Sequence, residues 1–370
     1  MKILVAGDYA PQNRIQTLLD KHDYSFFNEI KNITNNYDLA IVNLEAPITK
    51  GTDKLAKFGP NLKAPDETIV SVKYAGFNLV TLANNHIMDY GDTGLQDTLK
   101  ICETEKINTV GVGNNIEDAE QIFYFTAADG LKVAIINCCE HEFSVADTSN
   151  PGANPLNPIR QYYKIKEAKN SADVVLVIVH GGIERYQLPT SRMVETYRFF
   201  IEAGADCVIN HHQHCFSGFE EYKGKPIFYG LGNLCFDIGP DKGTWHEGFM
   251  VSLDITEHTL NYKLIPYCQC DENPAVSLVE PKDFNIRLSK LNNIISDSTK
   301  LKQNNDKHYK SDSELIKSVL TTIPGRILNK IYRMKLLSPA LRGIKVRMLE
   351  NYIQCESHRD KVLAVLKTIK

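Results

Sequence analysis

Short runs of valine, isoleucine and leucine recur through the first 210 residues of this 370-residue chain, and helix-like stretches separate them. Such runs are typical of buried strands, and their alternation with helices is typical of βαβ units around a largely parallel sheet. From about Pro226 the runs become adjacent, which implies a second sheet of antiparallel strands. The chain is therefore predicted to be an α/β protein. The strand-like runs are 3–6, 39–42, 79–83, 133–137, 174–179 and 207–210, followed by 227–229, 248–255 and 260–266.

Helix signals occupy three of the intervening stretches, at 65–75, 94–105 and 191–203. Gly204 directly follows the last of these, in the C-cap position that glycine favours because it tolerates a left-handed backbone. In the later part of the chain, Glu257 and His258 stand between two adjacent strand-like runs. We expect them near the turn of a hairpin.

The chain changes character after Pro281, where it becomes helical and charged. A polar stretch at 296–313 is predicted to be a loop or linker. We therefore predict one domain over residues 1–281 and a basic helical C-terminal extension over residues 282–370. The extension carries 19 Lys and Arg against 8 Asp and Glu, whereas the preceding residues carry 23 against 37. Such asymmetry indicates an anionic partner, or a solvated helix face docked on an acidic body.

Basic residues of the extension interleave with Ile, Leu and Met at helical spacing. This pattern is typical of an amphipathic helix on an anionic membrane surface or in a partner's groove, and an ordinary solvated helix face is the alternative. Nucleic acid is not an expected partner, because no basic stripe interleaved with aromatic residues accompanies the charge. The basic residues in question are Arg326, Lys330, Arg333, Lys335, Arg342, Lys345 and Arg347.

Composition places the chain among ordinary globular proteins, with 43% hydrophobic and 24% charged residues. Only four apolar residues precede Gly7 near the N-terminus, which is far short of a secretory signal. The longest apolar run is also far below the roughly 20 residues that span a bilayer. We expect a cytoplasmic protein, with a peripheral position at the inner face of the membrane as the alternative. The nine scattered cysteines are expected to be reduced and buried.

Residues that bind metals appear where the strand-like runs end. In an open α/β sheet the ligand crevice lies outside the carboxyl ends of the strands, so these segments are expected to converge. Taken singly, each signal has an ordinary alternative, such as a helix N-cap, a turn or a hydrogen-bonded histidine. Three histidines within four residues are rarer and favour a metal or phosphate site. The strand-end segments are Asp8, Asn43-Leu44-Glu45, Asn84-Asn85-His86, His180 and His211-His212-Gln213-His214.

The ligand types indicate the chemistry. A mixture of imidazole, carboxylate and amide groups suits zinc, manganese or iron, and the carboxylates are too few for a calcium cage. A carboxylate that bridges two such ions would hold them about 3.5 to 4 Å apart, a spacing that clamps a phosphate and activates water. The sequence therefore favours one or two divalent metal ions and phosphoester hydrolysis. A phosphorylated or polyanionic small molecule or polymer is the expected substrate.

These segments carry a family resemblance. Their order resembles the calcineurin-like metallophosphoesterase superfamily and, more closely, its capsule-synthesis branch, the CapA (poly-γ-glutamate synthesis) family. The resemblance covers about residues 1–255 and implies a four-layer α/β/β/α sandwich. The matching strings are Gly7-Asp8, Asn43-Leu44-Glu45, Leu82-Ala-Asn-Asn-His-Ile-Met-Asp-Tyr-Gly91, His180-Gly-Gly-Ile-Glu184, Gly204-Ala-Asp206, His211-His-Gln-His214 and Tyr229-Gly-Leu-Gly-Asn233.

The resemblance also implies residue roles. Asp8 would bind one metal and Glu45 would bridge, while the second metal would take Asn85 and His180. The pair His212 and His214 would be divided between the two ions. His86 would donate a proton to the leaving oxygen or stabilise charge in the transition state, with Asp89 orienting it; a structural histidine is the alternative. The remaining candidates, expected to line the substrate pocket or to be surface or turn residues, are Lys57, Lys63, Arg185, His211, Asn233 and Asp237.

The chain departs from the superfamily pattern at its first strand end. There the usual pattern is Asp-x-His, but Asp8 is followed by Tyr9 and Ala10, so one imidazole of the first metal is absent. Glu45 replaces the usual Asp of the second motif, and Asn210 replaces a Gly before the His-x-His segment. A weakened first metal position would give a mononuclear site, or a site that takes up its first metal only when substrate is bound.

Three functions remain open at this point. The first is an enzyme that hydrolyses or transfers a phosphoester in making a capsule, an exopolysaccharide or another surface polymer. The second is a non-hydrolytic assembly component for poly-γ-glutamate or capsule that uses the metal site for binding. The third is a membrane-associated scaffold in which the basic extension does the essential binding.

Overall fold

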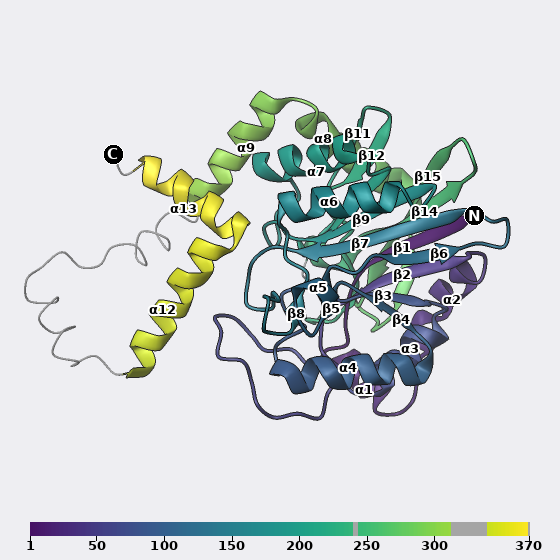
Figure 1. Cartoon of the computed structure of the whole chain (residues 1–370), viewed down its shortest axis with the longest axis horizontal. Helices are drawn as coiled ribbons and strands as arrows, with labels where there is room; N and C mark the ends of the chain where they lie inside the picture. The colour runs from purple at the N-terminus through teal and green to yellow at the C-terminus, as the bar shows by residue number, and fades with distance from the viewer. Residues whose placement is uncertain (240–242, 312–338, 369–370) are drawn as a thin grey trace, which may run out of the picture.

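The computed structural model describes residues 1–239, 243–311 and 339–368. Two large sheets lie face to face, and helices cover the outer face of each (Figure 1). A separate two-stranded sheet joins β5 (Val112–Gly113) to β8 (Gly152–Ala153). Within the described ranges, no helix is both long and apolar enough to cross a bilayer.

The first sheet has eight strands and contains the N-terminal strand near its centre. Its order is β16-β15-β14-β1-β2-β3-β4, and β13 pairs with the far end of β1. Strands β1 to β4 and β13 run parallel, whereas β14 returns antiparallel to β1. Their bounds are β1 (Lys2–Ala10), β2 (Leu39–Leu44), β3 (Leu79–Thr81), β4 (Asn108–Val110), β13 (Asn233–Phe236), β14 (Glu247–Ile255), β15 (Leu260–Gln269) and β16 (Val276–Leu278).

The second sheet has six strands in the order β11-β12-β10-β9-β7-β6. The four central strands are parallel, and an antiparallel strand closes each edge. Their bounds are β6 (Phe123–Thr126), β7 (Lys132–Cys139), β9 (Val174–His180), β10 (Cys207–His211), β11 (Phe219–Tyr222) and β12 (Lys225–Phe228).

Alternate side chains along each strand face opposite sides of the sheet, and this divides the apolar core into three layers. On β1, Ile3 and Val5 face the second sheet, while Leu4 and Ala6 face helices. The outer face of the first sheet packs against four helices and that of the second against two. This is the predicted four-layer α/β/β/α sandwich. The bounds are α1 (Arg14–Leu19), α2 (Asn28–Thr34), α3 (Glu67–Tyr74) and α4 (Gly91–Glu105) on one side, α6 (Pro158–Lys169) and α7 (Ser191–Ala203) on the other, and the short α5 (Ile116–Ala119).

Helix α7 shows how local sequence fixes one of these layers. The Thr190 side chain caps it by accepting a hydrogen bond from the Met193 N–H at 3.2 Å, and it ends at Gly204 with φ 126°. Its buried face repeats at helical spacing through Met193, Tyr197 and Phe200. Burying a side chain of this size contributes roughly 1.5–3 kcal/mol. The predicted bounds of this helix and its glycine cap are confirmed.

Two sequence predictions about the fold are wrong. The strands do not divide into a parallel sheet before residue 210 and an antiparallel one after it, because β12 joins β10 in the second sheet and β14 and β15 join β1 in the first. The polar stretch 296–313, predicted to be a loop, contains the helix α9 (Ser298–Ser311). Its apolar content is low, but Leu301 and Tyr309 are buried against the rest of the chain, and tertiary packing outweighs the weak local signal.

Other predictions about the fold are confirmed. The hairpin of β14 and β15 turns at Glu257 and His258. The nine cysteines are free, and all except Cys268 are buried.

The C-terminal extension packs directly on the body through α8 (Pro281–Ile295), α9 and α13 (Glu356–Thr368). Phe284 and Leu288 of α8 belong to the core between the two sheets. The remaining described helix is α12 (Pro339–Gln354). Of the predicted basic face, Arg326, Lys330, Arg333 and Lys335 lie outside the described residues, and the side chains of Arg342 and Lys345 are not described.

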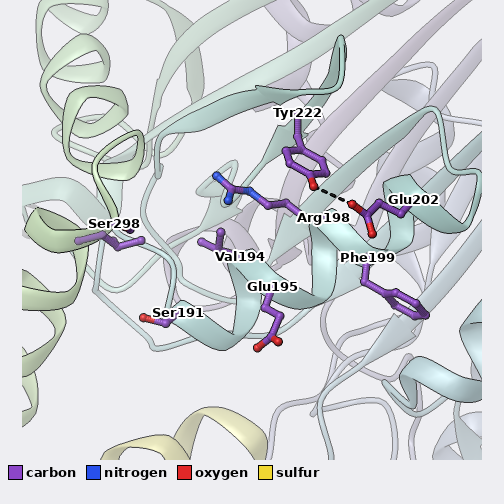
Figure 2. A pocket seen from close by; sticks show the side chains of 9 residues that line it. Ser191, Val194, Glu195, Arg198, Phe199, Glu202, Tyr222 and Ser298 are labelled. Carbon is purple, nitrogen blue, oxygen red and sulfur yellow. Dashed lines mark hydrogen bonds between the residues drawn. The ribbon is translucent and has the colours of Figure 1, made fainter.

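A hollow lies between α7, β11 and the first turn of α9 (Figure 2). Two of its charged side chains are engaged with neighbours: Arg198 donates to both oxygens of Glu220, and Glu202 accepts from Tyr222 and Lys223. Because these charges are already compensated, we treat the hollow as a packing feature of the α7–α9 contact.

Candidate metal centre

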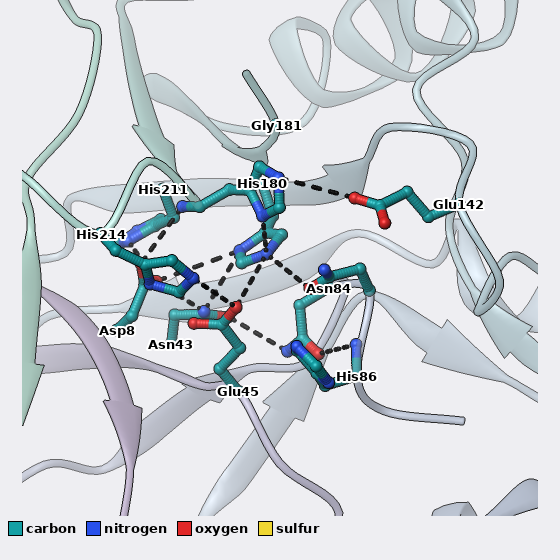
Figure 3. A network of polar contacts seen from close by, with 12 residues as sticks. Asp8, Asn43, Glu45, Asn84, His86, Glu142, His180, Gly181, His211 and His214 are labelled. Atoms are coloured by element: carbon teal, nitrogen blue, oxygen red, sulfur yellow. Dashed lines mark hydrogen bonds and ion pairs between the residues drawn. The ribbon is translucent and has the colours of Figure 1, made fainter. Parts of the chain in front are cut away.

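The predicted strand ends meet at one edge of the sandwich. Strands β1, β2 and β3 of the first sheet bring Asp8, Glu45 and the 84–86 segment, while β9 and β10 of the second sheet bring His180 and the 211–214 segment (Figure 3). The cluster therefore straddles the two sheets. The side chains of Asp8, Glu45, Asn85, His180, His212 and His214 are all buried.

Two hydrogen-bond donors and one imidazole surround the carboxylate of Asp8. Asn43 donates from Nδ2 to Oδ1 at 2.7 Å, the His212 backbone N–H donates to Oδ2 at 3.2 Å, and His211 Nδ1 lies 3.2 Å from Oδ1. Burial alone would raise the pKa of Asp8, but His211, His180 and His214 hold it below its ordinary value. The residue is therefore an anion suited to binding a cation.

His180 Nε2 is the point where three other candidate ligand atoms converge. Asn85 Oδ1 and His212 Nδ1 each lie 3.1 Å from it, and Glu45 Oε1 lies 3.4 Å away. A single ring proton can serve one of these neighbours. Burial, reinforced by the charge of His212, lowers the pKa of His180 well below its ordinary value and favours the neutral imidazole that binds metals.

Glu45 is the most unusual group in the site. It is fully buried, and neither carboxylate oxygen has a hydrogen-bond partner. Burial, followed by the charges of Asp8 and Glu184, raises the pKa of Glu45 well above its ordinary value. A buried carboxylate without donors is costly unless a cation accompanies it.

Glu45 also belongs to two groups of possible ligands at once. It shares one group with His180 and His212 and another with Asp8 and His214, and within each group the ligand atoms lie within 4.8 Å of one another. The donor types and the unpartnered Glu45 oxygens fit a divalent metal centre. The predicted bridging role of Glu45 stays a prediction, and its place in both ligand groups is compatible with it.

The two histidines of the His-x-His segment are held in unusual backbone conformations. His212 has φ 86° and His214 has φ 55°, a region that side chains other than glycine rarely adopt. Such conformations persist where the surroundings determine them, commonly at functional sites. His214 Nδ1 lies 2.9 Å from Asn233 Oδ1, and its ring packs on Trp245 at 4.7 Å between centroids. Asn233 therefore orients a candidate ligand rather than standing free for substrate.

His86 lies beside this cluster and forms a pair with Asp89. Its Nδ1 lies 2.6 Å from Asp89 Oδ2, and Lys57 Nζ contacts both His86 Nδ1 and the other Asp89 oxygen. Burial lowers the pKa of His86, and the hydrogen bond with Asp89 raises it. Asp89 thus fixes the ring through Nδ1. The side chain of Lys57, expected in the pocket or on the surface, is buried in this ion pair beside His86.

The structure places the remaining candidates for binding substrate in different surroundings. Asp237 accepts hydrogen bonds from Arg14 and from the Gly239 N–H, so it closes a turn and an ion pair. Lys63 donates to the Gly51 carbonyl at 3.1 Å and covers the ring of Tyr90. Arg185 is exposed and lies over Trp245, 5.0 Å from the ring centroid. His211 is buried against Asp8.

Several site residues had no role assigned from the sequence. Asn43 joins Asp8 to His180, since its Nδ2 also lies 3.3 Å from His180 Nδ1. Glu142 Oε1 lies 3.5 Å from His212 Nε2, and Glu184 forms a third possible ligand group with His212 and His214. Glu140 and Glu142 follow β7, so the rule of polar residues at strand ends would have found both.

Comparison with known proteins places the chain in a family. The family model described as "Bacterial capsule synthesis protein PGA_cap" matches residues 2–238. The chain belongs to the PGA_cap family. Within it, the chain is 31% identical over 249 residues to the capsule biosynthesis protein CapA of Bacillus anthracis, covering 65% of this chain and 60% of that protein. It is 33% identical over 218 residues to the PGA biosynthesis protein CapA of Bacillus subtilis, covering 58% and 57%.

The match spans about three fifths of the length of these PGA_cap relatives. Among solved structures, the calcineurin-like phosphoesterase YfkN of Bacillus subtilis aligns at 14% identity with a TM-score of 0.41, covering 72% of this chain and 90% of that one. The family assignment does not depend on this distant likeness. The predicted resemblance to the capsule-synthesis branch is confirmed, and the PGA_cap region contains every strand end of the metal centre.

Proposed function

We propose that this chain is a metal-dependent phosphoesterase-like enzyme that acts in the synthesis of capsule, polyglutamate or another surface polymer. The observation that carries the proposal is Glu45, a buried carboxylate with no donor that stands between two groups of histidine and carboxylate ligands. The family membership supports the polymer context.

One or two divalent ions would be held by Asp8, Glu45, Asn85, His180, His212 and His214. When bound, such ions supply Lewis acidity to a phosphoryl group and lower the pKa of water. The chain's own residues prepare the site for this chemistry. Asn43 and Asn233 orient Asp8 and His214, and burial lowers the pKa of His180 and of His214, which favours their neutral imidazoles. His86, held through Nδ1 by Asp89, offers Nε2 to the leaving oxygen of a phosphoester.

Metal content and hydrolysis test the proposal together. We expect the purified chain to bind Mn²⁺ or Zn²⁺ and to cleave a generic phosphodiester such as bis(p-nitrophenyl) phosphate. His212→Ala and Asp8→Ala should each lower both properties, because each removes a candidate ligand. A chain that binds metal but cleaves no phosphomonoester or phosphodiester would instead support a binding role in polymer assembly. Absence of metal binding would refute the metal centre itself.

Replacing His86 should separate catalysis from metal binding. We expect His86→Asn to lower kcat roughly 10²–10⁴-fold, the usual contribution of a general acid. The affinity for Mn²⁺ should change little, because His86 belongs to none of the ligand groups found among the described residues. Steady-state kinetics and calorimetric titration measure the two effects. Equal losses in both would show that His86 is a ligand or a structural residue.

A further inference from the structure

Three consecutive residues after β7 lie between the metal centre and the C-terminal extension. Glu140 and His141 face the extension, and Glu142 faces His212 at 3.5 Å. Figure 3 shows Glu142 reaching toward the histidine cluster from the side opposite Asp8 and Glu45. This short segment is therefore the contact through which the two parts of the chain can influence each other.

Glu140 is tied to the metal centre by its backbone and by its packing. Its N–H donates to the carbonyl oxygen of His180 at 3.0 Å, which joins it directly to a candidate ligand. Its side chain lies against Gly181, where an added Cβ would come within 2.6 Å of Glu140 Cγ. The absence of a side chain at Gly181 thus gives Glu140 the space it occupies.

The carboxylate of Glu140 is also the anchor of α13. Ser357 donates to it from Oγ at 2.9 Å and from its backbone N–H at 3.2 Å, at the first turn of the helix. An anion at this position interacts favourably with the helix dipole. Arg192 of α7 donates to Glu140 at 2.5 Å and to Asp360 of α13 at 2.9 Å. Although burial alone would raise it, Arg192 and Ser357 lower the pKa of Glu140, so the network is ionic.

In a second contact between α13 and the segment after β7, the carboxylate belongs to α13 and the donor to the segment. Glu356 of α13 accepts hydrogen bonds from the backbone N–H of His141 at 2.9 Å and lies 2.7 Å from its Nδ1. The next imidazole on α13, His358, has a buried Nδ1 with no hydrogen-bond partner. Burial lowers the pKa of His358, and the charges of Glu142 and His212 act on it. The first turn of α13 is thus close enough to the metal centre for charges there to act on His358.

The extension holds the loop after β9 as well. Tyr186, two residues beyond Glu184, donates to Asn305 of α9 at 2.8 Å and stacks on His308 with 4.0 Å between ring centroids. Asn305 in turn donates to the Pro189 carbonyl at 3.2 Å. The loops that follow β7 and β9 therefore both contact helices of the extension.

We propose that Glu140 is a positioning residue of the metal centre and that the C-terminal extension, through α13, is a structural part of that centre. The inference rests on the proposed metal site. In it, Glu140 fixes the His180 carbonyl and the loop that carries Glu142, while Ser357 and Arg192 fix Glu140. Loss of the Glu140 charge would release α13 and loosen the His180 and His212 side of the cluster.

The test compares two carboxylates that each pair with an arginine of α7; Glu140 is buried and Glu220 is partly buried. Glu140→Gln keeps the shape and removes the charge. Glu220→Gln is the matched control, because Glu220 pairs with Arg198 away from the metal centre. We expect Glu140→Gln to weaken Mn²⁺ binding by roughly 10–100-fold in calorimetric titration, the range found when partners of metal ligands are lost. The control should bind Mn²⁺ with an affinity within about twofold of wild type.

Equal Mn²⁺ affinities of the two variants would overturn the proposal. If Glu140→Gln does not fold, Ser357→Ala replaces it, since it removes one donor and keeps the ion pair. A severalfold weaker affinity than the control would then support the proposal, and an unchanged affinity would refute it. If wild-type protein binds no divalent metal, the proposed function fails separately. Amide exchange at Gly181 and His212 then decides the positioning role: it should be faster in the variant than in the control.

Discussion

Replacing Glu45 with glutamine is expected to stabilise the metal-free protein while removing most of its metal affinity. Glu45 is buried without a donor, and burial together with Asp8 and Glu184 raises its pKa well above 4.5. An uncompensated buried polar group costs roughly 1–3 kcal/mol, and a charged one more. Glutamine has the same shape without the charge, so we expect a gain of about 1 kcal/mol or more at pH 7 in the presence of a chelator.

The gain should depend on pH in a defined direction. Because folding raises the Glu45 pKa, the folded state keeps its proton to higher pH than the unfolded chain. This group therefore makes wild-type protein lose stability as the pH rises from about 4.5 toward the raised value. Glu45→Gln lacks this loss, so the difference between the two proteins should widen over that interval. Urea unfolding of chelated protein at several pH values measures it.

Metal binding should respond to Glu45→Gln in the opposite direction. A neutral amide cannot bridge two cations as a carboxylate does, and loss of even an outer partner typically costs 10–100-fold in affinity. We expect at least about 100-fold weaker Mn²⁺ binding. Glu220→Gln serves again as a control for removing a carboxylate away from the metal centre. A variant that lost stability and kept its metal would show that Glu45 is an ordinary structural acid.

Substitution of Gly7 with alanine should disrupt both stability and the metal centre. A Cβ on Gly7 would overlap the carbonyl oxygen of Gly232, and that oxygen accepts the hydrogen bond of the Asp8 N–H at 3.2 Å. The hydroxyl oxygen of Tyr267 would lie 3.0 Å from the added Cβ, so the new methyl group cannot avoid the clash by shifting toward Tyr267. Overpacking of this kind costs roughly 1–3 kcal/mol and more where backbone must shift. We expect a loss of about 3 kcal/mol and displacement of Asp8.

Gly51→Ala is the control for this substitution. A Cβ there would meet the Thr49 hydroxyl at 3.1 Å and the methyl groups of Thr93 and Thr49 at 3.6 and 3.9 Å, with no backbone atom among these neighbours. Urea unfolding and Mn²⁺ titration of both variants separate a local clash from a general effect of losing glycine. Near-identical unfolding free energies would contradict the close approach of β1 to β13.

The sequence predicted the strand ends of the metal centre because a single geometric rule applies to them. Buried runs of Val, Ile and Leu are recognisable locally, and polar residues directly after them converge at one edge. The rule placed Asp8, Glu45 and His180 correctly side by side. It could not show that these strands belong to two different sheets, because pairing between β1 and β14 joins residues about 250 positions apart.

Residues that act through others were harder to predict. Lys57 has the sequence context of a surface charge, and only the folded loop reveals its ion pair with Asp89. The polar helix α9 has little apolar periodicity, and its contacts with Tyr186 and Pro189 come from tertiary structure. Glu140 depends on Ser357, more than 200 positions later in the chain. No local sequence pattern marks contacts of this kind, so the sequence alone does not predict them.

The central place of β1 also has a consequence for biosynthesis. During synthesis β1 leaves the ribosome well before β14, and it gains this neighbour only after residue 255 has been made. Domains generally fold as units once their strands are available, and long-range strand pairing is slow. The Asp8 end of the candidate metal centre is therefore expected to form only after the whole matched region 2–238 and β14 have left the exit tunnel, and a nascent chain ending before β14 is expected to acquire no metal.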